Sequence, residues 1–151
     1  RGFKASPRRD TALARAFAPC YTTRAMAYRI LIVDDSPVLR LMLQEMLEAL
    51  GHQIVAQADS AASAMKAYKE HKPQLVTLDI SLPDKDGLTV LKELRQSDPS
   101  AAVVIITGNN QKAIEAQALN SKALGVLHKP FNQDELAALM EQVTVLLSRR
   151  R

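Results

Sequence analysis

The sequence has 151 residues, enough for one domain that buries about two-thirds of the surface of its unfolded chain. Its 47% hydrophobic and 24% charged residues are typical of a globular protein, and no apolar run approaches the roughly 20 residues of a membrane helix. A single cysteine, Cys20, excludes an intrachain disulfide and fits a reducing compartment. We therefore expect a cytoplasmic protein that does not bind a membrane.

The net charge of +4 comes from the ends of the chain. Residues 29–148 hold 11 Lys and Arg against 15 Asp and Glu, a net of −4, whereas the three residues 149–151 are all Arg. A nucleic-acid-binding domain places its positive charge on the fold itself, so we expect no direct binding to nucleic acid.

Residues 1–27 show no sustained spacing of apolar residues that would indicate a helix or a strand. We interpret them as a disordered basic extension that is not native or not part of the fold, with a transit peptide and a functional basic arm as alternatives.

The folded domain is expected over residues 28–148, followed by a basic tail at 149–151. Its first segment, 28–33, is a continuous apolar run, as expected of a parallel strand covered on both faces. Ser36 and Pro37 mark the start of a helix, as N-cap and first helical residue. Apolar residues then follow at helical spacing, and the segment 53–58 is interpreted as the second strand.

The second helix is expected to begin after Ser60, a good N-cap residue, and to end before Pro73. The third strand, 75–78, places Asp79 directly at its carboxyl end. A third helix is expected beyond Gly87, with leucines at helical spacing on its inner face.

The fourth strand is predicted at 102–106 and is followed by an Ala-rich helix at 110–122 and a short strand at 126–127. Asn132 and Glu135 form an Asn variant of the capping box at the start of the last helix. Four methionines are expected on core faces: Met42, Met46, Met65 and Met140. Five alternating strand and helix units predict one α/β domain, an open parallel sheet with helices on both faces and right-handed crossovers.

Polar side chains gather where these strands end. Asp34 and Asp35 follow the first strand, Asp79 follows the third, Thr107 the fourth and Lys129 the fifth. Ligand sites of open α/β sheets lie beyond the carboxyl ends of the strands, so these side chains are expected to converge. Three close carboxylates repel one another unless a cation lies among them, and oxygen ligands suit Mg²⁺.

The same residues are suited to accept a phosphoryl group. A carboxylate such as that of Asp79 can act as the nucleophile, and Mg²⁺ would neutralise charge during an in-line transfer. Lys129 offers a positive charge to one phosphoryl oxygen and Thr107 a hydrogen bond to another.

Four segments together resemble the signatures of response regulator receiver domains, the CheY-like proteins of two-component signal transduction. They are Val-Asp-Asp-Ser at 33–36, Leu-Asp-Ile-Ser-Leu-Pro-Asp-Lys-Asp-Gly at 78–87, Ile-Thr-Gly at 106–108 and Lys-Pro-Phe at 129–131. The resemblance implies a single (βα)5 doubly wound parallel sheet of the flavodoxin or CheY kind, with strand order 2-1-3-4-5.

The resemblance also implies a site. Asp79 would accept the phosphoryl group from a sensor histidine kinase or phosphotransfer protein. Mg²⁺ would be bound by Asp35, Asp79 and the backbone carbonyl of Ser81, while Asp34 orients the waters of the metal. Ser81 and Asn109 fall where the family tunes the lifetime of the phosphoryl group.

By the same resemblance, Lys129 contacts the phosphoryl group, the Lys129–Pro130 bond is cis, and Thr107 moves toward the phosphate. This switches contacts with a downstream protein target, in a monomer or a phosphorylation-dependent dimer. The chain would be a phosphoacceptor switch, catalysing only its own phosphorylation and dephosphorylation. Val126 stands where most members have an aromatic switch residue, which puts the relay from Thr107 to the surface in question.

Other functions need features that this sequence lacks or contradicts. A haloacid-dehalogenase-type Mg²⁺ phosphatase needs a second acid two residues after its nucleophile, where this chain has Ser81. A flavodoxin-like binding module needs a Gly-rich phosphate loop where the Asp34-Asp35 pair would repel phosphate. Within the family, we expect a stand-alone receiver, and the alternative is a receiver fragment of a larger regulator.

The three histidines are interpreted as solvated or structural: His52, His71 and His128.

Overall fold

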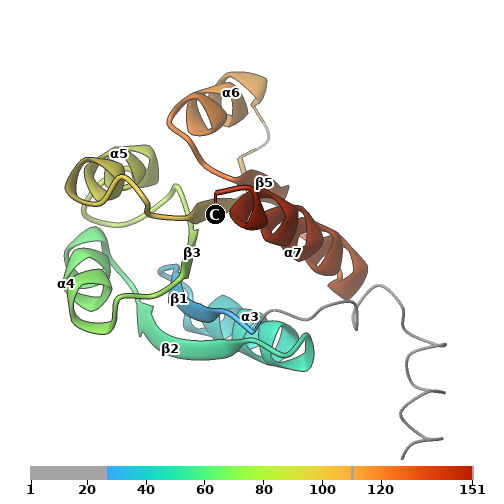
Figure 1. Ribbon diagram of the computed structural model, residues 1–151. Coiled ribbons are helices and arrows are strands. Elements are labelled where there is room, and N and C mark those ends of the chain that lie inside the picture. Colours follow the sequence, from blue (N-terminus) through green and yellow to red (C-terminus); the bar gives the residue numbers. More distant parts are fainter. Residues whose placement is uncertain (1–26, 110, 151) are drawn as a thin grey trace, which may run out of the picture.

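The computed structural model describes residues 27–109 and 111–150 (Figure 1). The interpretation of residues 1–26 as a basic extension lies outside the described residues, as does Arg151. The division into extension, domain and tail stays a prediction. Within the described ranges, no helix is both long enough and apolar enough to cross a membrane.

Five parallel strands form one sheet in the order β2-β1-β3-β4-β5, which confirms the predicted fold class. The strands are β1 (Arg29–Val33), β2 (Gln53–Ala58), β3 (Leu75–Leu78), β4 (Val103–Thr107) and β5 (Gly125–His128). β1, β3 and β4 are almost entirely buried, in agreement with their largely apolar sequences. The chain order reverses between β1 and β3, where open α/β sheets form their ligand sites.

Five helices connect and cover these strands: α3 (Pro37–Ala49), α4 (Ala61–His71), α5 (Gly87–Ser97), α6 (Lys112–Asn120) and α7 (Gln133–Ser148). The predicted caps are confirmed. The Ser36 hydroxyl accepts a hydrogen bond from the backbone nitrogen of Leu39, and Asn132 and Glu135 form a reciprocal capping box. α6 differs, because its N-cap residue Gln111 makes no side-chain capping bond.

The core lies on both faces of the sheet because alternate residues of each strand point to opposite sides. One apolar cluster joins the sheet to α4, α5 and α6, and the other joins it to α3 and α7 (Figure 1). Met140 is buried in the second cluster, as predicted, and Met46 and Met65 pack at the edges of the clusters. The prediction for Met42 was wrong, because α3 turns Leu43 and Leu47 inward and leaves Met42 43% exposed.

Candidate metal and phosphoryl-transfer site

The carboxyl edge of the sheet brings the predicted acids together. Asp34 and Asp35 follow β1, and Asp79 follows β3, the strand that pairs with β1. Each of the three acids offers a carboxylate oxygen, and these oxygens all lie within 4.8 Å of one another. Asp34 and Asp79 are only 1% and 4% exposed, whereas Asp35 is exposed. An oxygen-only set that opens to solvent on one side fits a hard cation such as Mg²⁺, which keeps several of its waters.

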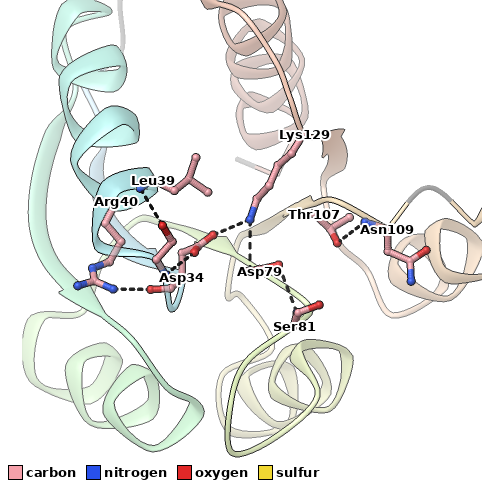
Figure 2. A network of polar contacts seen from close by, with 9 residues as sticks. Asp34, Leu39, Arg40, Asp79, Ser81, Thr107, Asn109 and Lys129 are labelled. Carbon is pink, nitrogen blue, oxygen red and sulfur yellow. Dashed lines mark hydrogen bonds and ion pairs between the residues drawn. The ribbon is translucent and has the colours of Figure 1, made fainter.

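Lys129 places its ammonium group between the two buried acids (Figure 2). Its Nζ lies 2.9 Å from Asp34 Oδ2 and 3.4 Å from Asp79 Oδ2. One ammonium does not balance three carboxylates, so the group retains a negative charge that a divalent cation would offset.

The charges of this group shift the pKa values of its members. Burial raises the pKa of Asp79, an effect that the positive charge of Lys129 opposes and the charge of Asp34 reinforces. Burial alone would lower the pKa of Lys129, but its hydrogen bond to Asp34 and the charge of Asp79 outweigh that effect and raise it. Lys129 therefore stays protonated beside the acids at neutral pH.

The loop after β1 is held in place by its own backbone and by a long side chain from α3. Asp34 accepts a hydrogen bond from the backbone nitrogen of Ser36 at 2.8 Å, which leaves its other oxygen for Lys129. The Arg40 guanidinium donates to the Asp34 backbone carbonyl at 2.6 Å and to Gln57 Oε1 at 3.1 Å. Arg40 thus fixes this loop against the end of β2. Sequence spacing alone does not reveal this role of Arg40, although Arg40 lies one helical turn beyond the cap of α3.

The loop after β3 doubles back closely on Asp79. The Asp79 carboxylate accepts a hydrogen bond from the backbone nitrogen of Ser81 at 3.2 Å, and the Gly87 nitrogen donates to the Ile80 carbonyl at 2.8 Å. A Cβ at position 87 would lie 2.3 Å from the Asp79 carbonyl oxygen, so only glycine fits there. The backbone of Ser81 lies beside the Asp79 carboxylate, and ligation of a metal by the Ser81 carbonyl stays a prediction.

The same loop is tied to the start of α4. The Asp84 carboxylate accepts hydrogen bonds from the backbone nitrogens of Ala61 and Ala62, at 2.8 and 3.1 Å. These bonds lower the pKa of Asp84, since they favour its ionised form at a helix N-terminus. This contact could not be predicted from the sequence, because it joins segments more than 20 residues apart.

Thr107 ends β4, and Lys129 directly follows the adjacent strand β5, at the other side of the site (Figure 2). Thr107 is 1% exposed, and its hydroxyl accepts a hydrogen bond from the backbone nitrogen of Asn109. The backbone nitrogen of Lys129 donates to the Thr107 carbonyl at 2.8 Å. The Lys129–Pro130 bond is cis, as the resemblance implied.

Comparison with known proteins identifies the family. Residues 30–141 match the model of the response regulator receiver domain, and the chain belongs to this family. It is 40% identical over 111 residues to the chemotaxis protein CheY of Bacillus subtilis, a match that covers 74% of this chain and 92% of that protein. It is also 35% identical over 113 residues to the virulence transcriptional regulatory protein PhoP of Salmonella typhimurium, which covers 75% of this chain and 50% of PhoP.

A solved structure supports the same assignment. The crystal structure of the CheX-CheY-BeF3-Mg²⁺ complex from Borrelia burgdorferi contains a chain with a TM-score of 0.75 and 28% identity. The similarity covers 78% of this chain and 89% of that one. This chain is therefore a receiver domain of the CheY and response-regulator type, and the phosphatase and flavodoxin-like alternatives are set aside. Its relatives include both CheY proteins and longer regulators.

Proposed function

We propose that Asp79 accepts a phosphoryl group in a Mg²⁺-dependent reaction and that the product switches contacts with a downstream protein. The observation that carries this proposal is the position of the buried Asp79 carboxylate, which lies among two further acids and 3.4 Å from the Lys129 ammonium. A buried carboxylate near a cation and a metal site can serve as an activated nucleophile. An Asp79 oxygen would attack phosphorus as the bond from phosphorus to the donor breaks, and the electron pair of that bond leaves with the donor.

The other residues of the site follow from this assignment. We propose that Asp35, Asp79 and the carbonyl of Ser81 bind Mg²⁺, while Asp34 orients metal-bound water. When bound, Mg²⁺ would offset the negative charge of the acids and of the incoming group. Lys129 would exchange its contact with Asp79 for a phosphoryl oxygen.

The Thr107 hydroxyl, which now accepts a hydrogen bond from the backbone nitrogen of Asn109, would donate one to a second phosphoryl oxygen. We further propose that the chain acts in the cytoplasm and catalyses only its own phosphorylation and dephosphorylation.

Acetyl phosphate tests this proposal without any partner protein. With Mg²⁺ present, the folded chain is expected to gain one phosphoryl group, measured by intact mass spectrometry. With EDTA in place of Mg²⁺, the gain is expected to disappear, because the acids then repel the anionic donor. An unchanged mass for the folded protein at millimolar acetyl phosphate and Mg²⁺ would rule out the assignment.

We propose that a sensor histidine kinase or phosphotransfer protein docks on α3 to deliver the phosphoryl group. The N-terminal half of α3 carries an exposed apolar stripe next to the Asp34 loop. Its members are Val38, Leu41 and Met42, which are 70%, 56% and 43% exposed. Residues at this spacing lie on one helix face, and an exposed apolar patch beside a reactive group is typical of a docking surface.

The variant Leu41→Asp separates docking from chemistry. A charge in the middle of this stripe is expected to slow phosphorylation by a kinase or phosphotransfer protein about tenfold or more. Phosphorylation by acetyl phosphate is expected to stay unchanged, because Leu41 is exposed and is not a residue of the acidic site. The two rates are measured by mass spectrometry on the same preparation. Equal transfer from the protein donor to both chains would show that the donor docks elsewhere.

A further inference from the structure

His128, the last residue of β5, lies directly beside Thr107 in the sheet. The two residues are paired in the register of β4 and β5. Paired residues of adjacent parallel strands project to the same face. Val126, two residues before His128, packs in the cluster that includes α6, so Thr107 and His128 face α6 as well. His128 is therefore the neighbour of the phosphoryl-site threonine on this face.

The imidazole of His128 is linked to α6. Its Nε2 lies 3.5 Å from Oε1 of Glu115, in the first turn of α6, and the two side chains are 38% and 41% exposed. Its Nδ1 is buried and has no hydrogen-bond partner within the described residues. Val126, which has no polar side-chain atom, cannot make such a link.

α6 itself is lightly fixed to the domain. Its N-cap residue Gln111 makes no side-chain capping bond, and Ala118 is the only buried residue within Lys112–Asn120. Leu119 is 47% exposed. Helical segments with few buried apolar side chains are those that shift at low free-energy cost.

We propose that His128 is the residue that transmits phosphorylation of Asp79 to α6. The inference rests on the proposed function of Asp79. Movement of Thr107 toward a phosphoryl group changes the surroundings of the adjacent imidazole, and the pair with Glu115 passes this change to α6. An aromatic ring at position 126 is then not required. The pair of His128 and Glu115 couples β5 to α6 instead, two residues further along β5 than Val126.

Hydrogen exchange of the α6 amides tests the proposal. In the unmodified chain, beryllofluoride with Mg²⁺, a persistent phosphoryl mimic, is expected to change the exchange rates of residues 112–120 by about threefold or more. The variants His128→Val and Glu115→Ala are expected to lose most of this change, and the double variant to lose no more than either single one. His128→Gln retains a donor near the position of Nε2 and is expected to keep the response.

Two controls distinguish the outcomes. The first is Glu93→Ala on α5, which removes an exposed ion pair with Lys85 of the preceding loop and is expected to leave the α6 response intact. The second is the mass gain with acetyl phosphate, which is expected in every variant. Absence of that gain from the unmodified chain refutes the proposed function itself. Two results refute the relay through His128 when the mass gain is normal. One is an unchanged hydrogen-exchange response of α6 in His128→Val, and the other is the absence of any α6 response in the unmodified chain.

Discussion

The variant Asp79→Asn is expected to abolish phosphorylation by acetyl phosphate while leaving the domain folded. An amide is a far weaker nucleophile than a carboxylate, so no phosphoryl group should be gained over a time in which the unmodified chain is fully modified. The change also removes one of the two carboxylates that we propose bind Mg²⁺ directly, so the affinity for the ion is expected to fall. Intact mass spectrometry and a Mg²⁺ titration measure the two effects.

The stability of this variant has a predictable sign. Burial raises the pKa of Asp79 in the folded state, so its contribution to stability is present below the unfolded pKa and is lost as pH rises through the folded pKa. At neutral pH the buried carboxylate is therefore a cost. Asp79→Asn removes that cost, and Lys129 keeps its bond to Asp34. We expect the variant to be at least as stable as the unmodified chain at pH 7, measured by urea unfolding without Mg²⁺.

Asp59→Asn is the matched control. Asp59 follows β2 at the same edge of the sheet but is exposed and lies outside the three-acid group. Its variant is expected to be phosphorylated at the normal rate. If Asp79→Asn still gained a phosphoryl group as fast as Asp59→Asn, another residue would be the acceptor.

Much of this architecture follows from local sequence patterns. The strand Leu75–Leu78 could be predicted to the residue, because a short apolar run is bounded by Pro73 and Asp79. The caps at Ser60 and Asn132 could be predicted because they depend on residues only three positions apart. The site residues could be placed at one edge because all parallel strands end there.

Features that depend on contacts between distant segments could not be predicted in this way. The exposed position of Met42 depends on the rotation of α3 against the sheet, and one residue along a helix turns a side chain by about 100°. Arg40 and Asp84 act on backbone groups of other elements, which sequence spacing does not reveal. Residue 110 of the predicted helix 110–122 lies outside the described residues, and within them α6 is shorter, spanning Lys112–Asn120. Just before this helix, the Asn109 side chain accepts a hydrogen bond from the backbone nitrogen of Gln111, a local bond that competes with helix formation.

The variant Lys129→Met is expected to have opposite effects on stability and on Mg²⁺ affinity. Asp34 and Asp79 are 1% and 4% exposed, and the Lys129 ammonium is within 3.4 Å of both. Without the ammonium, the two buried carboxylates repel each other, and the free energy of unfolding in EDTA should fall by about 2 kcal/mol. This is less than the full cost of breaking a buried pair, because the Lys129 side chain is 25% exposed.

Magnesium is expected to reverse this loss. Removing the ammonium makes the acidic group more negative, so the variant should bind Mg²⁺ about tenfold more tightly than the unmodified chain. Saturating Mg²⁺ should then restore most of the lost stability, since a ligand that binds only the folded state stabilises it. Calorimetric titration with MgCl₂ and urea unfolding with and without Mg²⁺ measure both effects.

The control for this variant is Lys85→Met, which removes a lysine from an exposed pair with Glu93. Exposed pairs contribute little to stability, so this change should alter neither stability nor Mg²⁺ affinity. If Lys129→Met lost the same stability with and without Mg²⁺, or bound the ion more weakly, then Lys129 would not be the counterion of the acids that we propose hold the metal. The same result would also weaken the case for Asp79 as the phosphoacceptor. That case requires the Lys129 ammonium and Mg²⁺ to act on the same group of carboxylates, to which Asp79 belongs.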